Sequence, residues 1–106
     1  MSINKNLYKV VFTKDAKQEL NNIFYYISNN LYQKETSKKL MLRIEDVVQN
    51  LKFNPKIYPI IRNYSNLTYR KIAVENYIIL YSIYEERNII YIVHIYNSKM
   101  NYIDRI

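Results

Sequence analysis

The sequence predicts an α+β domain in which an N-terminal strand and a two-helix hairpin pack on an antiparallel β-sheet. Three runs rich in β-branched and aromatic residues follow one another between Tyr69 and Tyr96, with short polar breaks between them; such runs are typical of an antiparallel meander. Two earlier stretches, between Thr13 and Lys52, carry apolar residues at every third or fourth position, as amphipathic helices do. At 106 residues, we expect a single domain that covers residues 1–106.

The N-terminal half predicts a strand followed by two helices. Residues 8–12 form a short alternating run, which favours a strand. Thr13 is a good N-cap, so we expect the first helix to follow it and to end near residue 29 or 30. The second helix is expected to be capped by Thr36 or Ser37 and to end before Pro55, because the residue before a proline avoids helical geometry.

The C-terminal half predicts a loop and then three strands. The loop is expected over residues 57–68 and the strands over residues 69–74, 77–84 and 89–96. Because the chain has no Gly, Asn76 and Asn88 are the natural residues for a positive φ in the two turns. A two-residue first turn would set Lys71 opposite Leu80 and would fix which side chains share a face.

This register gives a sheet with two apolar faces. One face collects Ile72, Val74, Tyr77, Ile79, Tyr81 and Ile83, together with Ile90, Ile92 and His94. The other face collects Lys71, Ala73, Ile78, Leu80, Ser82 and Tyr84, together with Tyr91, Val93 and Ile95. The helices of the chain can cover one face only. We therefore expect the second face to be open for a partner.

The composition excludes several kinds of site. The chain has no Cys, which excludes disulfides, thiolate nucleophiles and Cys-ligated zinc and fits a reducing cytoplasm. It has no apolar run near the roughly 20 residues of a membrane span, and we expect no signal peptide. Its formal net charge of +7, from 16 Lys and Arg against 9 Asp and Glu, favours a nucleic acid or an acidic protein as partner.

The single histidine, His94, does not indicate a metal site. No His, Asp or Glu residues flank it at metal-binding spacing, so we expect no metal and no cofactor. Its place among the apolar residues of the first face favours a packed, hydrogen-bonded structural role. Without Gly, no nucleophile elbow can form around a catalytic serine.

The basic residues near the strand ends are more informative. Arg70 and Lys71 begin the first meander strand, Lys99 follows the last strand, and Tyr102 lies three residues beyond Lys99. Lys and Arg can hold a phosphodiester and stabilise charge at phosphorus, and a nearby Tyr can act as an acid or base. RNA carries its own nucleophile, the 2′-hydroxyl, so a small basic site can cleave it without a metal. The structural alternative is that these residues are solvated charges.

A set of short motifs follows one order along the chain. They are Phe12-Thr13 with Ala16 and Leu20, Tyr26-Ile27, Leu51, Pro55, Tyr58-Pro59, Tyr69-Arg70-Lys71-Ile72, Val74, Asn76-Tyr77, Tyr81, and Lys99 with Tyr102. In this order and at this length they resemble the RelE/ParE superfamily of type II toxin–antitoxin toxins, across nearly the whole chain. The resemblance implies a toxin that a cognate antitoxin, encoded beside it, holds inactive.

The resemblance also implies two possible targets and a set of site residues. RelE-like members cleave mRNA on the ribosome, whereas ParE-like members inhibit DNA gyrase without catalysis. For mRNA cleavage the implied catalytic residues are Lys71, Lys99, Tyr102 and Tyr96, and the implied phosphate-binding residues are Arg70, Lys71 and Arg62. The antitoxin would contact Ile78, Leu80, Tyr91 and Val93.

Two departures from the family pattern keep the alternatives open. Ile78 follows Tyr77, where the family often has Arg, and Asn97 stands where nuclease members often have His or Tyr. Both departures leave room for a gyrase inhibitor or for a toxin with impaired activity. A basic RNA-binding module without catalysis is the third alternative.

Overall fold

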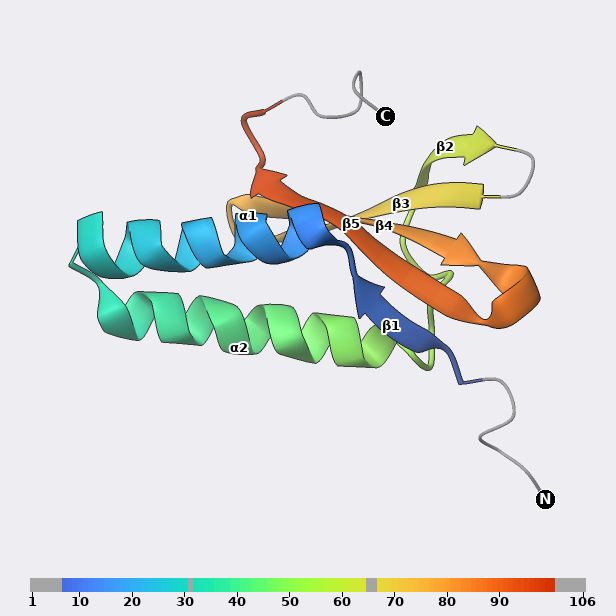
Figure 1. Ribbon diagram of the computed structural model, residues 1–106, viewed down its shortest axis with the longest axis horizontal. Coiled ribbons are helices and arrows are strands. Elements are labelled where there is room, and N and C mark those ends of the chain that lie inside the picture. The colour runs from blue at the N-terminus through green and yellow to red at the C-terminus, as the bar shows by residue number, and fades with distance from the viewer. Residues whose placement is uncertain (1–6, 31, 65–66, 101–106) are drawn as a thin grey trace.

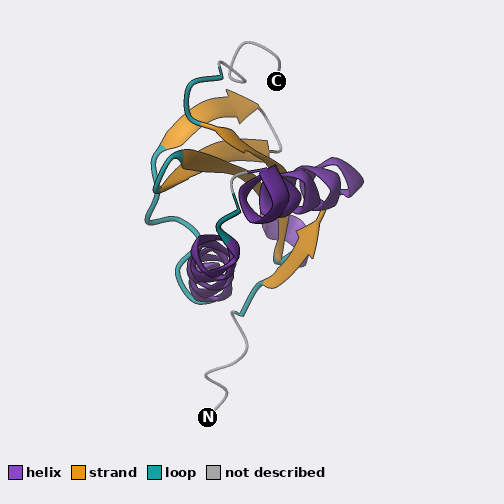
Figure 2. Cartoon of the chain, turned by 90° about the vertical axis from the view of Figure 1, so that its left-hand side faces the viewer, coloured by secondary structure: helices purple, strands orange, loops and turns teal. Residues whose placement is uncertain are grey.

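Two helices cover one side of a five-stranded sheet. The computed structural model describes residues 7–30, 32–64 and 67–100. Figure 1 shows α1 (Lys14–Tyr25) and α2 (Lys34–Leu51) running alongside each other next to the sheet, and Figure 2 shows the strands curving over them. Side chains of both helices and of one sheet face form a single hydrophobic core. The predicted α+β class is therefore confirmed.

The sheet has the strand order β1-β5-β4-β3-β2. Its strands are β1 (Lys9–Phe12), β2 (Ile60–Tyr64), β3 (Leu67–Val74), β4 (Tyr77–Tyr84) and β5 (Ile89–Asn97). β2 to β5 pair antiparallel, whereas β1 pairs parallel with β5. The connection from β1 to β5 runs through both helices and the three other strands, and it supplies the crossover that a parallel pair requires. The sheet is therefore mixed. The sequence left open whether β1 joins the last strand or the middle one, and it joins the last.

The first helix forms where the sequence predicts it. Thr13 has extended backbone angles, and its hydroxyl accepts a hydrogen bond from the Ala16 N–H, as an N-cap does. Asp15 lies in the first turn, where its negative charge suits the helix dipole. α1 ends at Tyr25 and continues as a π-helical turn (Tyr26–Asn30). The predicted end near residue 29 or 30 thus corresponds to the end of this turn.

The predicted cap of the second helix is wrong. α2 begins at Lys34, and its N-cap residue is Gln33, whose side chain makes no capping hydrogen bond. Ser37 is instead completely buried, and its hydroxyl lies 2.6 Å from that of Ser28. Ser37 was predicted as a cap because serine is common there, but packing between the helices decides its role. The buried residues Leu40, Ile44, Val48 and Leu51 form the apolar stripe of α2.

The predicted register of β3 and β4 is confirmed. Val74 lies opposite Tyr77 and Lys71 opposite Leu80. Asn88 has a positive φ of 53°, as expected. In the other turn, however, the positive φ of 54° belongs to Glu75, so the expectation for Asn76 is wrong. This two-residue turn needs its left-handed backbone at the first position, and the sequence places Glu there.

A β-bulge in β5 overturns part of the predicted face assignment. Leu80 lies opposite His94, whereas the next residue, Tyr81, lies opposite Ile92. Val93 is therefore an extra residue, and it reverses the alternation of every later side chain in the strand. Ile95 joins the core with the helices, and His94 moves to the opposite face. The sequence predicted the reverse for both residues, because it counted the strand as regular.

The predicted loop over residues 57–68 contains a strand. β2 pairs with β3, which begins at Leu67 rather than at Tyr69, with an irregularity between Ile60 and Arg62. The polar residues of β2 made this strand hard to predict, because an edge strand is stabilised by pairing as well as by apolar side chains.

No helix within the described ranges is long and apolar enough to cross a membrane.

Candidate functional site

The candidate site lies on the outer face of the sheet, which we define as the side opposite the hydrophobic core. The pairing register assigns to it Arg62 and Tyr64 of β2, Tyr69 and Lys71 of β3, Leu80 and Ser82 of β4, and Tyr91, His94 and Tyr96 of β5. One row of paired residues runs Lys71–Leu80–His94 across three strands. Arg62 lies opposite Tyr69, one step along from Lys71 on the same face. Three nitrogen-bearing side chains thus share this face.

The spacing of these side chains suits an extended anion. Lys71 and His94 are two strands apart, about 10 Å between Cα atoms at about 4.8 Å per strand. Arg62 is a diagonal neighbour of Lys71, at about 7–8 Å. Leu80, between Lys71 and His94, is completely buried, so it forms an apolar floor. The long Lys and Arg side chains can therefore converge on phosphates above this floor.

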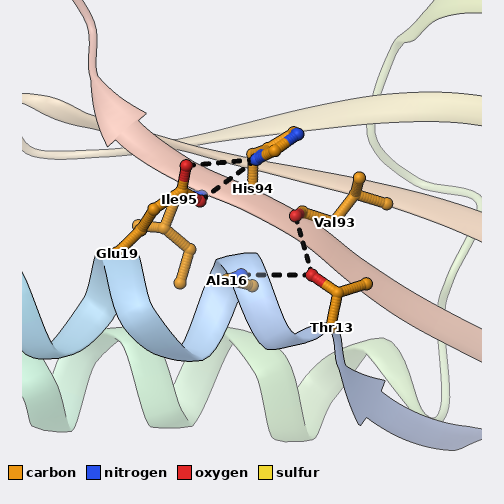
Figure 3. Close-up of polar contacts among 6 residues, drawn as sticks. All are labelled: Thr13, Ala16, Glu19, Val93, His94 and Ile95. Atoms are coloured by element: carbon orange, nitrogen blue, oxygen red, sulfur yellow. Dashed lines mark hydrogen bonds and ion pairs between the residues drawn. The ribbon is translucent and has the colours of Figure 1, made fainter.

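Glu19 of α1 holds His94 in place. One carboxylate oxygen lies 3.1 Å and the other 3.2 Å from Nδ1 of the ring, as Figure 3 shows. The same carboxylate accepts a hydrogen bond of 2.9 Å from the Ile95 N–H. The His94 and Glu19 side chains are 24% and 21% exposed. This partial burial shields the contact from water and strengthens it.

The contact with Glu19 selects the form of the imidazole. A carboxylate only accepts hydrogen bonds, so Nδ1 must carry a proton here. In the neutral ring the basic lone pair is then on Nε2. Carboxylates that orient a histidine in this way fix its tautomer and the orientation of its ring. The arrangement therefore prepares His94 to accept or donate a proton through Nε2.

Thr13 explains why Glu19 reaches β5. β1 ends at Phe12 opposite Ile92, and the Thr13 hydroxyl then donates a 2.9 Å hydrogen bond to the Val93 carbonyl. This bond fixes the start of α1 against the bulge in β5, as Figure 3 shows. Glu19 follows less than two turns later, beside the edge of β5 that β1 does not cover. The cap and the bulge together position the pair of Glu19 and His94.

The structure places Arg70 away from Lys71. Alternation along β3 directs Arg70 to the inner face, opposite Tyr81. Its Nη1 donates hydrogen bonds of 2.6 Å to the Tyr58 carbonyl and 3.0 Å to the Lys56 carbonyl. The guanidinium thus joins β3 to the segment that follows α2. Of the predicted phosphate ligands, Arg62 and Lys71 share the outer face and Arg70 does not.

The other predicted catalytic residues lie farther along the face. Tyr96 is 5% exposed and lies opposite Ile78 on β4, the next outer-face position after His94. Lys99 is exposed in the turn after β5, where its N–H donates to Oδ1 of Asn97 at 2.9 Å. β5 ends three residues past His94, so at about 3.4 Å per residue its end is roughly 10 Å beyond the row of Lys71, and Lys99 follows two residues later. Tyr102 lies outside the described residues.

The residues predicted to bind an antitoxin differ in exposure. Leu80 is completely buried, whereas Ile78, Tyr91 and Val93 are half-buried. The centre of the expected patch is therefore closed, and only its margins reach the surface.

In the described part of the chain, no three His, Cys, Asp or Glu side chains gather closely enough to hold a metal ion.

Sequence reasoning missed two residues of this site. His94 was expected to pack on the inner face, and Glu19 was not singled out. Their partnership spans 75 positions of the chain and depends on the bulge at Val93, for which no local sequence signal exists. Glu19 stands among other polar residues of α1, and no sequence pattern distinguishes it from them. Only the assembled fold brings the two together.

Comparison with known proteins agrees with this fold. Residues 10–102 match the model of a family described as "ParE toxin of type II toxin-antitoxin system, parDE". Among curated proteins, no sequence matches. Among solved structures, a chain of the chromosomal ParDE toxin–antitoxin system from P. aeruginosa is similar, with a TM-score of 0.70 and 16% identity over 88% of this chain and 98% of that chain.

Two further solved structures are RelE–RelB assemblies. A chain of the archaeal RelE–RelB complex from Pyrococcus horikoshii OT3 has a TM-score of 0.58 and 14% identity, covering 90% of this chain and 99% of that one. A chain of the RelBE2 complex from Mycobacterium tuberculosis has a TM-score of 0.61 and 16% identity, covering 86% and 98%. At these identities the structures support the shared fold, and the family match covers most of the sequence. The chain is therefore a member of the ParE toxin family of type II toxin–antitoxin systems, within the RelE/ParE superfamily.

Proposed function

We propose that this toxin arrests growth by cleaving mRNA on the ribosome, at the outer face of its sheet. The observation that carries the proposal is the His94 ring, held at 3.1 Å by Glu19 on the same face as Lys71 and Arg62. An oriented imidazole beside cations supplies what metal-independent RNA cleavage needs, a proton acceptor and charge stabilisation at phosphorus.

The cleavage uses the 2′-hydroxyl of the RNA as its nucleophile. Nε2 of His94 accepts the 2′-hydroxyl proton while O2′ forms a bond to phosphorus. The bond between phosphorus and O5′ breaks, and Tyr96 or Tyr102 donates the proton that the leaving O5′ takes up. Lys71 stabilises the charge that develops on the phosphoryl oxygens. Arg62 and Lys99 hold neighbouring phosphates, and the products carry a 2′,3′-cyclic phosphate and a 5′-hydroxyl.

A purified translation system with a reporter mRNA tests the proposal, with primer extension to locate cuts. We expect Lys71→Ala to slow cleavage by about 10²–10³-fold, as for the loss of one transition-state donor. We expect His94→Gln to slow it by about 10²–10⁴-fold. Arg87→Ala, which removes the same charge from an exposed turn, is the control and should cleave normally. A folded wild-type protein that leaves the mRNA intact would refute the proposal.

Inhibition of DNA gyrase is the second candidate function. It is favoured by the structural similarity, which is greater for the ParDE chain, at a TM-score of 0.70, than for the RelE chains, at 0.58 and 0.61. This function needs no catalysis, only a contact surface. A supercoiling assay with purified gyrase separates the two candidates, since a gyrase inhibitor would block supercoiling and leave mRNA intact.

The partner that we propose for either function is a cognate antitoxin. The three similar structures come from toxin–antitoxin assemblies, and the net charge of +7 favours an acidic segment. That segment would cover the outer face, with apolar contacts to the half-buried Ile78, Tyr91 and Val93 and charge pairing to Lys71. Val93→Asp should weaken co-purification with the antitoxin, because it places a repelling charge in that contact.

A further inference from the structure

A groove of about 390 Å³ lies between α1 and the edge of β5. β1 ends opposite Ile92, so among residues 7–30, 32–64 and 67–100 no strand pairs with the later part of β5 on that side. Glu19 lines the groove and accepts the Ile95 N–H. Figure 1 shows α1 passing alongside this end of β5. The volume is within the range of small-ligand sites.

Three tyrosines give the groove aromatic walls. Tyr26 begins the π-helical turn and is 52% exposed, and such turns often occur at functional sites. Tyr77 lies at the start of β4, and burial, followed by the effects of Tyr26 and Glu75, raises the pKa of its phenol. Tyr96 lines the groove from β5. Aromatic side chains in such a setting can stack on a base of any kind.

The polar groups of the groove match the edge of a nucleobase. Asn22 and Asn97 line it together with Glu19. Asn97 Oδ1 accepts the Lys99 N–H at 2.9 Å, and the NH₂ group of the same amide can donate to a ligand. Amides pair with base edges, and a carboxylate accepts from an exocyclic amino group. This combination favours adenine, cytosine or guanine over uracil, which has no amino group.

We propose that this groove binds one unstacked nucleobase of single-stranded RNA, next to the bond that is cut. The inference rests on the proposed mRNA cleavage, because Glu19 belongs both to the groove and to the contact with His94. Lys99, two residues beyond Asn97, is exposed and can hold the adjoining phosphate.

The test uses reporter mRNAs that carry A, C, G or U at the position next to the cut, in the purified translation system. We expect wild-type protein to cut least at U, and Asn22→Ala to reduce this preference. Tyr26→Ala should raise KM about tenfold, the effect of losing one base–aromatic stack, with kcat nearly unchanged. Asn21→Ala and Tyr25→Ala are matched controls, because both residues are exposed neighbours outside the groove lining.

The outcomes separate the two proposals. If wild-type protein cuts no mRNA, the proposed function fails and the base site fails with it. If wild-type protein cuts mRNA and Tyr26→Ala retains the same KM and base preference, the base site alone is refuted. If Tyr26→Ala instead loses antitoxin binding while its cleavage is unchanged, the groove is a protein contact and the inference is overturned.

Discussion

Tyr81→Phe removes one hydroxyl from the centre of the core. Tyr81 is completely buried in β4, and its hydroxyl donates a 2.6 Å hydrogen bond to the Pro55 carbonyl. Its ring packs edge-on against Tyr58, with centroids 6.4 Å apart. The Phe ring can keep this packing. The substitution therefore isolates the hydrogen bond that ties the segment after α2 to the inner face of the sheet.

The expected loss in the free energy of unfolding is large for the removal of a single oxygen atom. Pro55 is buried, so its carbonyl would have no replacement donor, and leaving such a group unpaired costs about 1–3 kcal/mol. Each kcal/mol lowers the Tm of a domain of this size by about 4–8 °C. Urea and thermal unfolding at pH 7 measure the change. Tyr84→Phe is the control, because Tyr84 is half-buried on the opposite face, and it should change stability by less than about 0.5 kcal/mol.

The same variant has a predicted effect at high pH. Burial raises the pKa of the Tyr81 phenol above its ordinary value of 10.0, because the interior disfavours the phenolate. Above pH 10 the unfolded chain loses this proton while the folded chain keeps it, so wild-type stability falls as pH rises. The fall should be shallower in Tyr81→Phe. Equal stability at pH 7, with parallel curves above pH 10, would refute the reasoning.

Three further substitutions test the local structure by urea unfolding. Thr13→Ala should lower the free energy of unfolding by about 1–2 kcal/mol, because it removes both the cap and the bond to Val93; Thr13→Ser keeps both bonds and should be close to wild type. Ser37→Ala should cost about 1–3 kcal/mol, because it leaves the buried Ser28 hydroxyl unpaired; a neutral result would contradict the burial. Asn88→Gly should be tolerated at its φ of 53°, whereas Asn88→Ala should cost about 1 kcal/mol; equal stability of the two would argue against a left-handed residue.

The elements that local patterns specify were predictable from the sequence. Thr13 predicts the start of α1, and the spacing of Leu40, Ile44 and Val48 predicts α2. The pairing of Lys71 with Leu80 follows from a two-residue turn. In these places, propensity, apolar periodicity and capping all indicate the same structure. The outer-face position of Lys71 follows from that register alone.

The rest of the site depends on contacts between distant segments. An extra residue at Val93 decides the face on which His94 lies, and strand propensity does not reveal a bulge. Arg70 looks equivalent to Lys71 in the sequence, but carbonyls of the segment after α2 bind it on the inner face. Glu19 acquires its role only because α1 passes the part of β5 that lies beyond its pairing with β1. These are tertiary effects, which local pattern cannot report.

The mRNA cleavage proposal is tested most directly in cells, by mapping transcript 5′ ends after induction of the toxin, alongside plasmid supercoiling. We predict new 5′ ends within translated regions for wild type and for Arg87→Ala, a loss of these ends in Lys71→Ala and His94→Gln, and unchanged supercoiling throughout. Growth arrest with intact transcripts and relaxed plasmids would contradict the account and indicate gyrase as the target.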